Sequence, residues 1–233
     1  MKSEQKKNGT AAQSGGVMVY ILLALALLGA LTMTLSRQNE QSDAQNIDDE
    51  LVEFQVTRLL NYAQSAQSVV DQMIMSGSNT SDLVFDLPNS ASFDTAPYIH
   101  KVYHPEGGGL ISGKADPEIF TGTDNDPDPG WYMGLFNNVE WTPSATQDII
   151  LTAHQISKPA CENINLKVTG TTTIPAIAGT GVLADYLIDD SLHTGTNADF
   201  TAVVCASCDG IAGLCVSNAA ADMWSYFIVI EGQ

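Results

Sequence analysis

The four cysteines are the residues of this chain with the most easily recognised chemistry. Cys205 and Cys208 enclose two residues, whereas Cys161 and Cys215 stand alone. A C-x-x-C pair occurs in dithiol redox enzymes and as half of a zinc site. The chain has no second C-x-x-C, and no thioredoxin-like strand leads into a helix at this one. The pattern therefore favours structural disulfides over a redox centre or a metal site.

Four cysteines allow three disulfide pairings. We expect Cys205 to join Cys208 in a small ring, which leaves Cys161 to bridge to Cys215 and to close a loop of about 55 residues. The alternative joins Cys161 to Cys205 and Cys208 to Cys215. Its small loop is geometrically easier, so this alternative stays open.

A run of alternating aspartates is the best candidate metal site. Asp124, Asp126 and Asp128 match the opening of a calcium loop, because Ca²⁺ prefers several carboxylate oxygens around it. However, Pro129 stands where an EF-hand loop needs glycine, and Leu135 where it needs the bidentate glutamate. These departures favour an acidic proline-rich loop, with calcium binding as the alternative.

No other group of residues predicts an enzyme or a cofactor. His100 and His104 are four residues apart without a third ligand, so they are expected to be surface histidines. The chain lacks Gly-x-Ser-x-Gly, and the glycine-rich stretches 107–109 and 179–181 lack the Lys-Ser/Thr of a phosphate loop. We therefore expect a protein that is not an enzyme.

An apolar segment near the start of the chain must anchor whatever follows it. From Val17 to Leu35 there is no charged side chain. At about 1.5 Å per residue, a helix over 17–35 spans roughly 28 Å, which is about the thickness of a bilayer's hydrocarbon core. A buried helix of a globular protein seldom needs apolar side chains on every face. We therefore expect a transmembrane helix.

The flanks of this segment orient it. Lys2, Lys6 and Lys7 precede the segment, and an acidic stretch follows Arg37. Because positive charge stays on the cytoplasmic side, we expect a cytoplasmic N-terminus in the bacterial inner membrane and a periplasmic or extracellular C-terminal domain. A secretory signal peptide is the alternative, but its apolar core is usually only about 7–15 residues long.

The charge balance excludes one class of partner. The whole chain carries a formal net charge of −18, and residues 38–233 hold five basic residues against 26 acidic ones. Such a surface repels phosphate backbones. We therefore expect no nucleic-acid partner.

Residues 36–77 are expected to continue the helix beyond the membrane. Apolar residues recur there at intervals of four and three, which is typical of one buried helix face: Val52, Val56, Leu59, Ala63, Ala66, Val70 and Met73. We prefer a helix that lies on its own domain to a free coiled coil. Gly77 is the expected end of the helix.

Residues 78–233 are expected to form a β-rich domain. Short apolar runs alternate there with Gly, Pro, Asn and Asp, and the expected strands cover 83–85, 98–103, 131–136, 148–153 and 223–230. A short helix is expected to begin at Ser157, with Pro159 in its first turn. The predicted fold class is therefore α+β, a long N-terminal helix packed on a disulfide-bonded β-rich domain.

These features together resemble the type IV pilin and pseudopilin superfamily. The specific matches are the basic leader 1–16 ending in Gly16, the apolar helix that starts at Val17, its amphipathic continuation, and the cysteines around the final strand. The resemblance implies cleavage between Gly16 and Val17 by a prepilin peptidase. It also implies contacts with other pilin-like subunits through residues 17–60, in an extracytoplasmic filament or a secretion pseudopilus.

The chain departs from the family pattern at two positions. Ile21 stands where most members carry a glutamate that pairs with the neighbouring subunit, and Val17 replaces the usual Phe or Met. Some tip-located minor pseudopilins also lack the glutamate, so the departure indicates a minor or tip subunit. The alternative function is an anchored adhesin or ligand-binding ectodomain that never polymerises.

Overall fold

The computed structural model describes residues 27, 50–143, 145–178 and 182–231. The chain divides into two compact units, Met1–Glu50 and Leu51–Gln233, and the fold described below is that of the second. The predicted leader, its cleavage position and all of the predicted transmembrane helix except Leu27 lie outside the described residues. Within the described ranges, no helix is both long and apolar enough to cross a membrane.

Residues 50–75 form one helix. Its apolar side chains are buried from Val56 to Met73, as expected for a single stripe at helical spacing. The helix ends before Gly77, whose φ of 102° is left-handed. The backbone amides of Gly77 and Ser78 donate to carbonyls of the last turn, which is the Schellman arrangement that glycine permits. The predicted stripe and the predicted end of the helix are both confirmed.

One antiparallel sheet lies at the centre of this unit. It has the order β1-β2-β4-β3, with β1 at Gly130–Asn137, β2 at Asp148–His154, β3 at Gly213–Ser217 and β4 at Trp224–Glu231. Every residue of β2 is buried. Because successive side chains of a strand point to opposite faces, both faces of the sheet must be covered.

The first face of the sheet packs on the helix at 50–75 and on α2, Lys158–Thr169. The side chain of Ser157 caps α2 by accepting a hydrogen bond from the amide of Ala160, and Gly170 ends the helix with a φ of 77°. The expected short helix is therefore confirmed. The buried apolar side chains that join these helices to the sheet are Val56, Leu59, Ala63, Ala66, Val70, Met73, Met133, Ile149, Leu151, Ala153, Cys161, Ile164, Tyr226 and Ile230.

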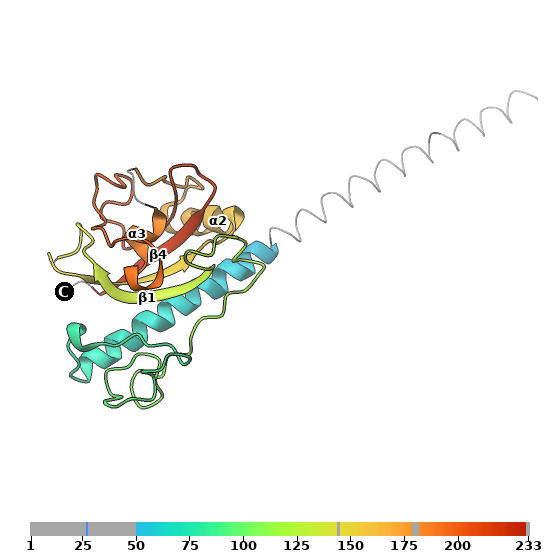
Figure 1. Cartoon of the computed structure of the whole chain (residues 1–233). Coiled ribbons are helices and arrows are strands. Elements are labelled where there is room, and N and C mark those ends of the chain that lie inside the picture. Colours follow the sequence, from blue (N-terminus) through green and yellow to red (C-terminus); the bar gives the residue numbers. More distant parts are fainter. Residues whose placement is uncertain (1–26, 28–49, 144, 179–181, 232–233) are drawn as a thin grey trace, which may run out of the picture. The chain divides into compact units, whose positions relative to one another are not determined.

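The second face of the sheet is covered by α3, Leu183–Leu187, and by irregular chain (Figure 1). A 3-10 turn, η2 at Asp190–Leu192, follows α3 and buries none of its residues. The buried core of the second face contains Phe136, Val139, Ile150, Ile177, Leu187, Ile188, Phe200, Leu214, Val216 and Phe227. The described residues thus form an α+β fold with a four-stranded antiparallel sheet between two apolar layers. A short 3-10 turn, η1 at Thr80–Asp82, follows the long helix.

Two of the expected strands do not form. Residues 83–85 and 98–103 are joined only by a single parallel bridge between Val84 and Lys101. The side chain of Lys101 turns inward, where its ammonium group donates to the carbonyls of Ser92 and Phe93 and lies 3.7 Å from the carboxylate of Asp86. A buried lysine requires such partners. Residues 98–103 therefore form turns and one bridge instead of a strand, and the loop at 92–93 holds the inward side chain of Lys101.

Candidate functional site

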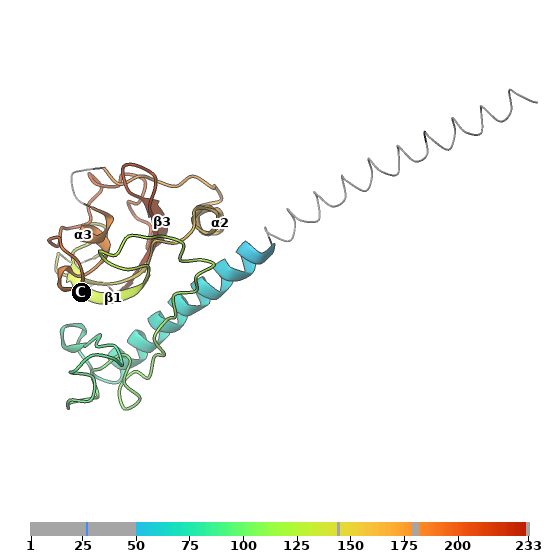
Figure 2. The same cartoon turned by 45° about the vertical axis from the view of Figure 1, so that its right-hand side comes forward.

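The structure joins Cys161 to Cys215 and Cys205 to Cys208, which is the pairing that we expected from the sequence. The first bridge ties α2 to β3, which lie side by side in Figure 2. All four residues are at most 2 % exposed, and none is a free thiol. Dithiol exchange needs an accessible thiolate. In this state the cysteines therefore stabilise the fold.

The three aspartates of the predicted calcium loop do not converge. Asp126 accepts hydrogen bonds from the amide and the hydroxyl of Thr194, and these bonds lower the pKa of Asp126. Asp124 accepts from the amide of Asp126, and the carbonyl of Asp128 accepts from the hydroxyl of Tyr132. No group of three or more His, Cys, Asp or Glu side chains in the described ranges could hold a metal ion. In this structure protein hydrogen bonds fix the loop, and calcium binding stays a prediction.

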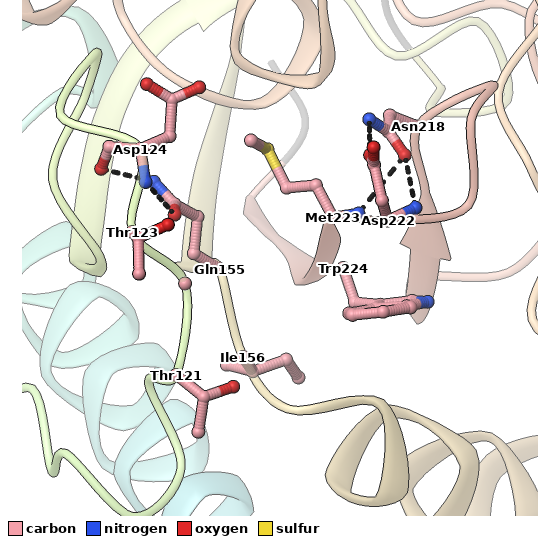
Figure 3. Close-up of a pocket in the computed structure, with 10 residues that line it drawn as sticks. Thr121, Thr123, Asp124, Gln155, Ile156, Asn218, Asp222, Met223 and Trp224 are labelled. Atoms are coloured by element: carbon pink, nitrogen blue, oxygen red, sulfur yellow. Dashed lines mark hydrogen bonds between the residues drawn. The ribbon is translucent and has the colours of Figure 1, made fainter.

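A polar pocket of about 490 Å³ lies beside this loop (Figure 3). The pocket is formed by the loop at 121–124, the end of β2 and the turn at 218–224. Its lining residues are Thr121, Gly122, Thr123, Asp124, Gln155, Ile156, Asn218, Asp222, Met223 and Trp224. In Figure 3, Asp124 and Asp222 lie on opposite sides of the pocket, with the side chain of Met223 between them.

Gln155 fixes the first wall of this pocket. Its side chain accepts from the amide of Asp124 and donates to the carbonyls of Asp124 and Pro127. A Cβ at Gly122 would lie 2.1 Å from the Gln155 amide oxygen, so only glycine fits there. Gln155 has a φ of 61°, and Ala221, beyond the opposite wall, has a φ of 55°. Left-handed backbone at residues with side chains is uncommon and occurs often at functional sites.

Asn218 fixes the second wall. Its side-chain oxygen accepts from the amides of Asp222 and Met223, and its amide nitrogen donates to the carboxylate of Asp222. The pocket then offers two carboxylates, those of Asp124 and Asp222, and the half-buried indole of Trp224, with no basic lining residue. This chemistry suits a polar or cationic ligand.

His154 lies at the end of β2 beside the pocket and is uncharged at neutral pH. Its side chain is buried, and its Nδ1 lies 2.8 Å from the hydroxyl of Ser225. Burial lowers the pKa of His154 to about 4, an effect that Asp124 opposes and His193 reinforces. A histidine that stays neutral adds no positive charge to the pocket.

The predicted surface histidines differ from each other. His100 is half-buried, and its Nδ1 lies 3.0 Å from the hydroxyl of Ser78. His104 is buried, accepts a hydrogen bond from the amide of Glu106 and stacks on the ring of Tyr98. The surface prediction was therefore wrong for His104. Each ring has its own local partners, and the two do not form a shared site.

The beginning of the long helix carries exposed apolar side chains. Leu51 is 45 % exposed and Phe54 is 60 % exposed, although Val56 nearby is fully buried. The guanidinium of Arg58 lies 5.9 Å from the centre of the Phe54 ring. We call Leu51, Phe54 and Arg58 the helix-entry surface. It falls within the range 17–60 through which we expect subunits to contact one another.

Sequence reasoning missed Gln155, Asn218 and Asp222. They are separated from Asp124 along the chain, and no local motif links them. Only the antiparallel pairing of β2 with β4 brings the ends of these strands together. The chain matches no protein-family model, no curated protein and no solved structure.

Proposed function

We propose that this chain is a pilin-like structural subunit, anchored in the inner membrane and assembling through its N-terminal helix into an extracytoplasmic filament or a secretion pseudopilus. The observation that carries this proposal is that the helix at 50–75 has both buried and exposed apolar side chains. Its apolar stripe packs on the protein's own sheet, whereas Leu51 and Phe54 stay exposed. An exposed apolar surface on the helical segment nearest to residues 17–35 is suited to neighbouring subunits.

The apolar segment at 17–35 is suited to both environments of such a subunit, the membrane and the filament. In the membrane, the side chains from Val17 to Leu35 are surrounded by lipid. In a filament, they pack on the equivalent helices of neighbouring subunits instead, since apolar side chains are satisfied by lipid or by one another. Ile21 carries no charge to pair with a neighbour's N-terminus, which favours a minor or tip subunit.

Processing of the leader tests this proposal. Intact-mass measurement of the membrane-purified protein from cells with an active prepilin peptidase should give a chain that begins at Val17. A Gly16→Val variant should keep its leader and lose surface display. Gly15→Val is the matched control, because it makes the same substitution one residue earlier and should be processed. An unchanged Met1 in the wild-type protein would contradict the proposal.

A second candidate function is an anchored ectodomain that binds a polar or cationic ligand and never polymerises. The observation in its favour is the pocket between Asp124 and Asp222, with the left-handed residue Gln155 in its lining. This function requires no cleavage at Gly16. Unchanged surface display of the Gly16→Val variant would therefore favour the ectodomain over the filament subunit.

A further inference from the structure

The outer edge of β1 pairs with no other strand, although its composition is unusual for an edge strand. β1 lies at one border of the sheet and pairs with β2 alone (Figure 2). Its sequence, GWYMGLFN, contains no charged residue and no proline. Edge strands normally carry lysine, proline or a cover that prevents pairing with other chains. The edge of β1 has none of these side-chain protections.

The backbone groups along this edge are available for pairing. An edge strand directs about half of its N–H and C=O groups away from its only partner. In the described part of the chain, no hydrogen bond joins the backbone of residues 131–135 to any segment other than β2. Further along, the side chain of Gln147 donates to the carbonyl of Phe136, the amide of Asn138 donates to Asp199, and the carbonyl of Asn138 accepts from the amide of Phe200. The unpaired part of the edge is therefore residues 131–135.

A groove follows this edge. Its first part is a cavity of about 660 Å³, and its second part is a cavity of about 510 Å³. Residues 131–135 line the first and residues 135–138 the second, so both cavities share Leu135, and they also share Ser81. Alternate side chains of a strand point to opposite faces. A cavity lined by consecutive residues therefore runs along the edge of β1 and not over one face.

The opposite wall of the groove is apolar and its rim is acidic. The segment 83–87 supplies Leu83, Phe85 and Leu87, and η2 supplies Leu192. The charged lining residues are Asp86 and Asp189 in the first cavity and Asp199 in the second, with no lysine, arginine or histidine in either lining. Because the ammonium group of Lys101 lies 3.7 Å from the carboxylate of Asp86, the unbalanced negative charge comes from Asp189 and Asp199. Because the segment 83–87 lines the same cavity as β1, protein bounds the space beside this edge, which favours a single extended chain over a second copy of the whole sheet.

We propose that this groove binds an extended segment of a partner protein, about seven residues long, in which apolar side chains alternate with lysine or arginine. The segment adds a strand to the outer edge of β1. Its backbone hydrogen bonds supply affinity, and its alternate side chains meet the apolar wall and the acidic rim. Residues 38–233 of this chain hold only five basic residues, so charge complementarity favours a different protein over a second copy.

The direct test is hydrogen exchange of the full-length protein in detergent, followed by mass spectrometry. The probe is a nine-residue peptide that alternates lysine and valine. Two controls are a glutamate–valine peptide and the lysine–valine peptide with alternate backbone nitrogens methylated. The lysine–valine peptide should slow exchange of the amides at 131–135 in a saturable way. Both controls should leave these amides unchanged, because one lacks the charge and the other the backbone donors.

Matched variants of the protein locate the binding site. Leu192→Lys places a positive charge in the groove and should weaken peptide binding by at least about tenfold. Val203→Lys makes the same change in charge at a residue that is 87 % exposed and does not line the groove, and it should bind like the wild type. Leu87→Lys is a second groove variant, and the thermal transition of each variant establishes that it is folded.

Two results would overturn the proposal. Equal binding of the methylated peptide would mean that the acidic surface attracts cations without strand pairing. Protection of residues 131–135 that rises with protein concentration in the absence of peptide would assign the groove to a second copy. Neither result bears on leader cleavage, so the groove and the filament function can fail separately.

Discussion

The two faces of the central sheet are covered in different ways. The first face carries two regular helices, the one at 50–75 and α2, whose apolar side chains meet the strands at regular intervals. The second face carries a five-residue helix, α3, and loops whose aromatic side chains fill the core individually. There, Phe200 contacts the rings of Trp141, Tyr186 and Phe227.

Buried polar side chains tie a cover to the sheet on both faces, but among the described residues only the first face also has a disulfide that joins its cover to a strand and a long apolar stripe. Buried side chains tie the second cover to the sheet: the amide of Asn137 donates to the carbonyls of Asp185 and Tyr186, and the hydroxyl of Thr152 donates to Leu187. On the first face, the long helix is held by its apolar stripe. α2 is fastened by the disulfide between Cys161 and Cys215 and by the buried side chain of Asn165, which donates to the carbonyl of Cys215 and accepts from its amide. We therefore expect the stability of the first face to be spread over many residues of its two helices. The stability of the second face, covered by α3 and loops, should depend on a few side chains.

The largest expected effect is at the centre of the irregular cover. Phe200→Ala removes a fully buried ring and should cost about 3–5 kcal/mol of unfolding free energy, because the surrounding loops cannot fill the cavity. Urea denaturation of the full-length protein in detergent measures this loss. Val203→Ala, at an exposed position in the same loop, should change stability by less than about 0.5 kcal/mol. Similar values for the two variants would mean that the second face has no packed core.

The two disulfides should differ in the stability that they supply. Replacing Cys161 and Cys215 together by alanine opens a loop with a sequence separation of 54 and should cost about 4 kcal/mol in the chain-entropy model. Replacing Cys205 and Cys208 opens a loop with a separation of 3 and should cost about 2 kcal/mol. Denaturation curves of the two double variants measure the difference. Equal losses would contradict the assignment of the long bridge as the main fastener of the first face.

Acid should weaken the fold through His154. Its pKa is about 4 in the folded protein, against 6.5 for the ordinary side chain, so the unfolded chain binds the proton first. The contribution of neutral His154 is complete above pH 6.5 and is lost as the pH falls towards 4. The total loss is about 3 kcal/mol. His154→Gln should remove this component from the pH dependence of the unfolding free energy, and identical slopes for variant and wild type would contradict the prediction.

The smallest effect concerns the end of the long helix. Gly77→Ala forces a residue with a Cβ into left-handed backbone and should cost about 1 kcal/mol. Gly130→Ala is the control, because Gly130 does not have positive φ and a Cβ there would meet its nearest neighbour at 3.9 Å. Thermal denaturation should show a lower transition for Gly77→Ala alone. A loss at Gly130 as large as at Gly77 would mean that backbone conformation is not the cause.

The periodic half of the fold could be predicted from the sequence, because local signals determine it. Spacing revealed the helix stripe, Ser157 and Pro159 marked the start of α2, and apolar runs marked β1, β2 and β4. The irregular cover has no such period, and its ties run from side chains such as Asn137 and Thr152 to distant carbonyls. Lys101 marks a strand that was predicted but does not form. It lies in the apolar run 98–103, and its buried ammonium group donates to the carbonyls of Ser92 and Phe93.

The sequence also predicted some of the candidate sites and missed others. The spacing of Cys205 and Cys208 favoured the observed disulfide pairing but left one alternative open, which the structure decides. The sequence did not reveal that the three aspartates point apart, because alternating carboxylates say nothing about their hydrogen-bond partners, and Thr194, which binds Asp126, is distant in the sequence. The predictions for Gly16, Val17 and the transmembrane segment stay predictions, since they lie outside the described residues.

Cross-linking between copies tests the central claim, assembly through the long helix, most directly. A photoreactive benzophenone amino acid would be placed at Phe54, in the helix-entry surface, or at Val203, in the loop over the opposite face of the sheet; both residues are exposed. After irradiation of intact cells, the account predicts dimers and higher multimers from position 54 and monomers from position 203. Monomers alone from position 54, or equal multimers from both positions, would contradict it.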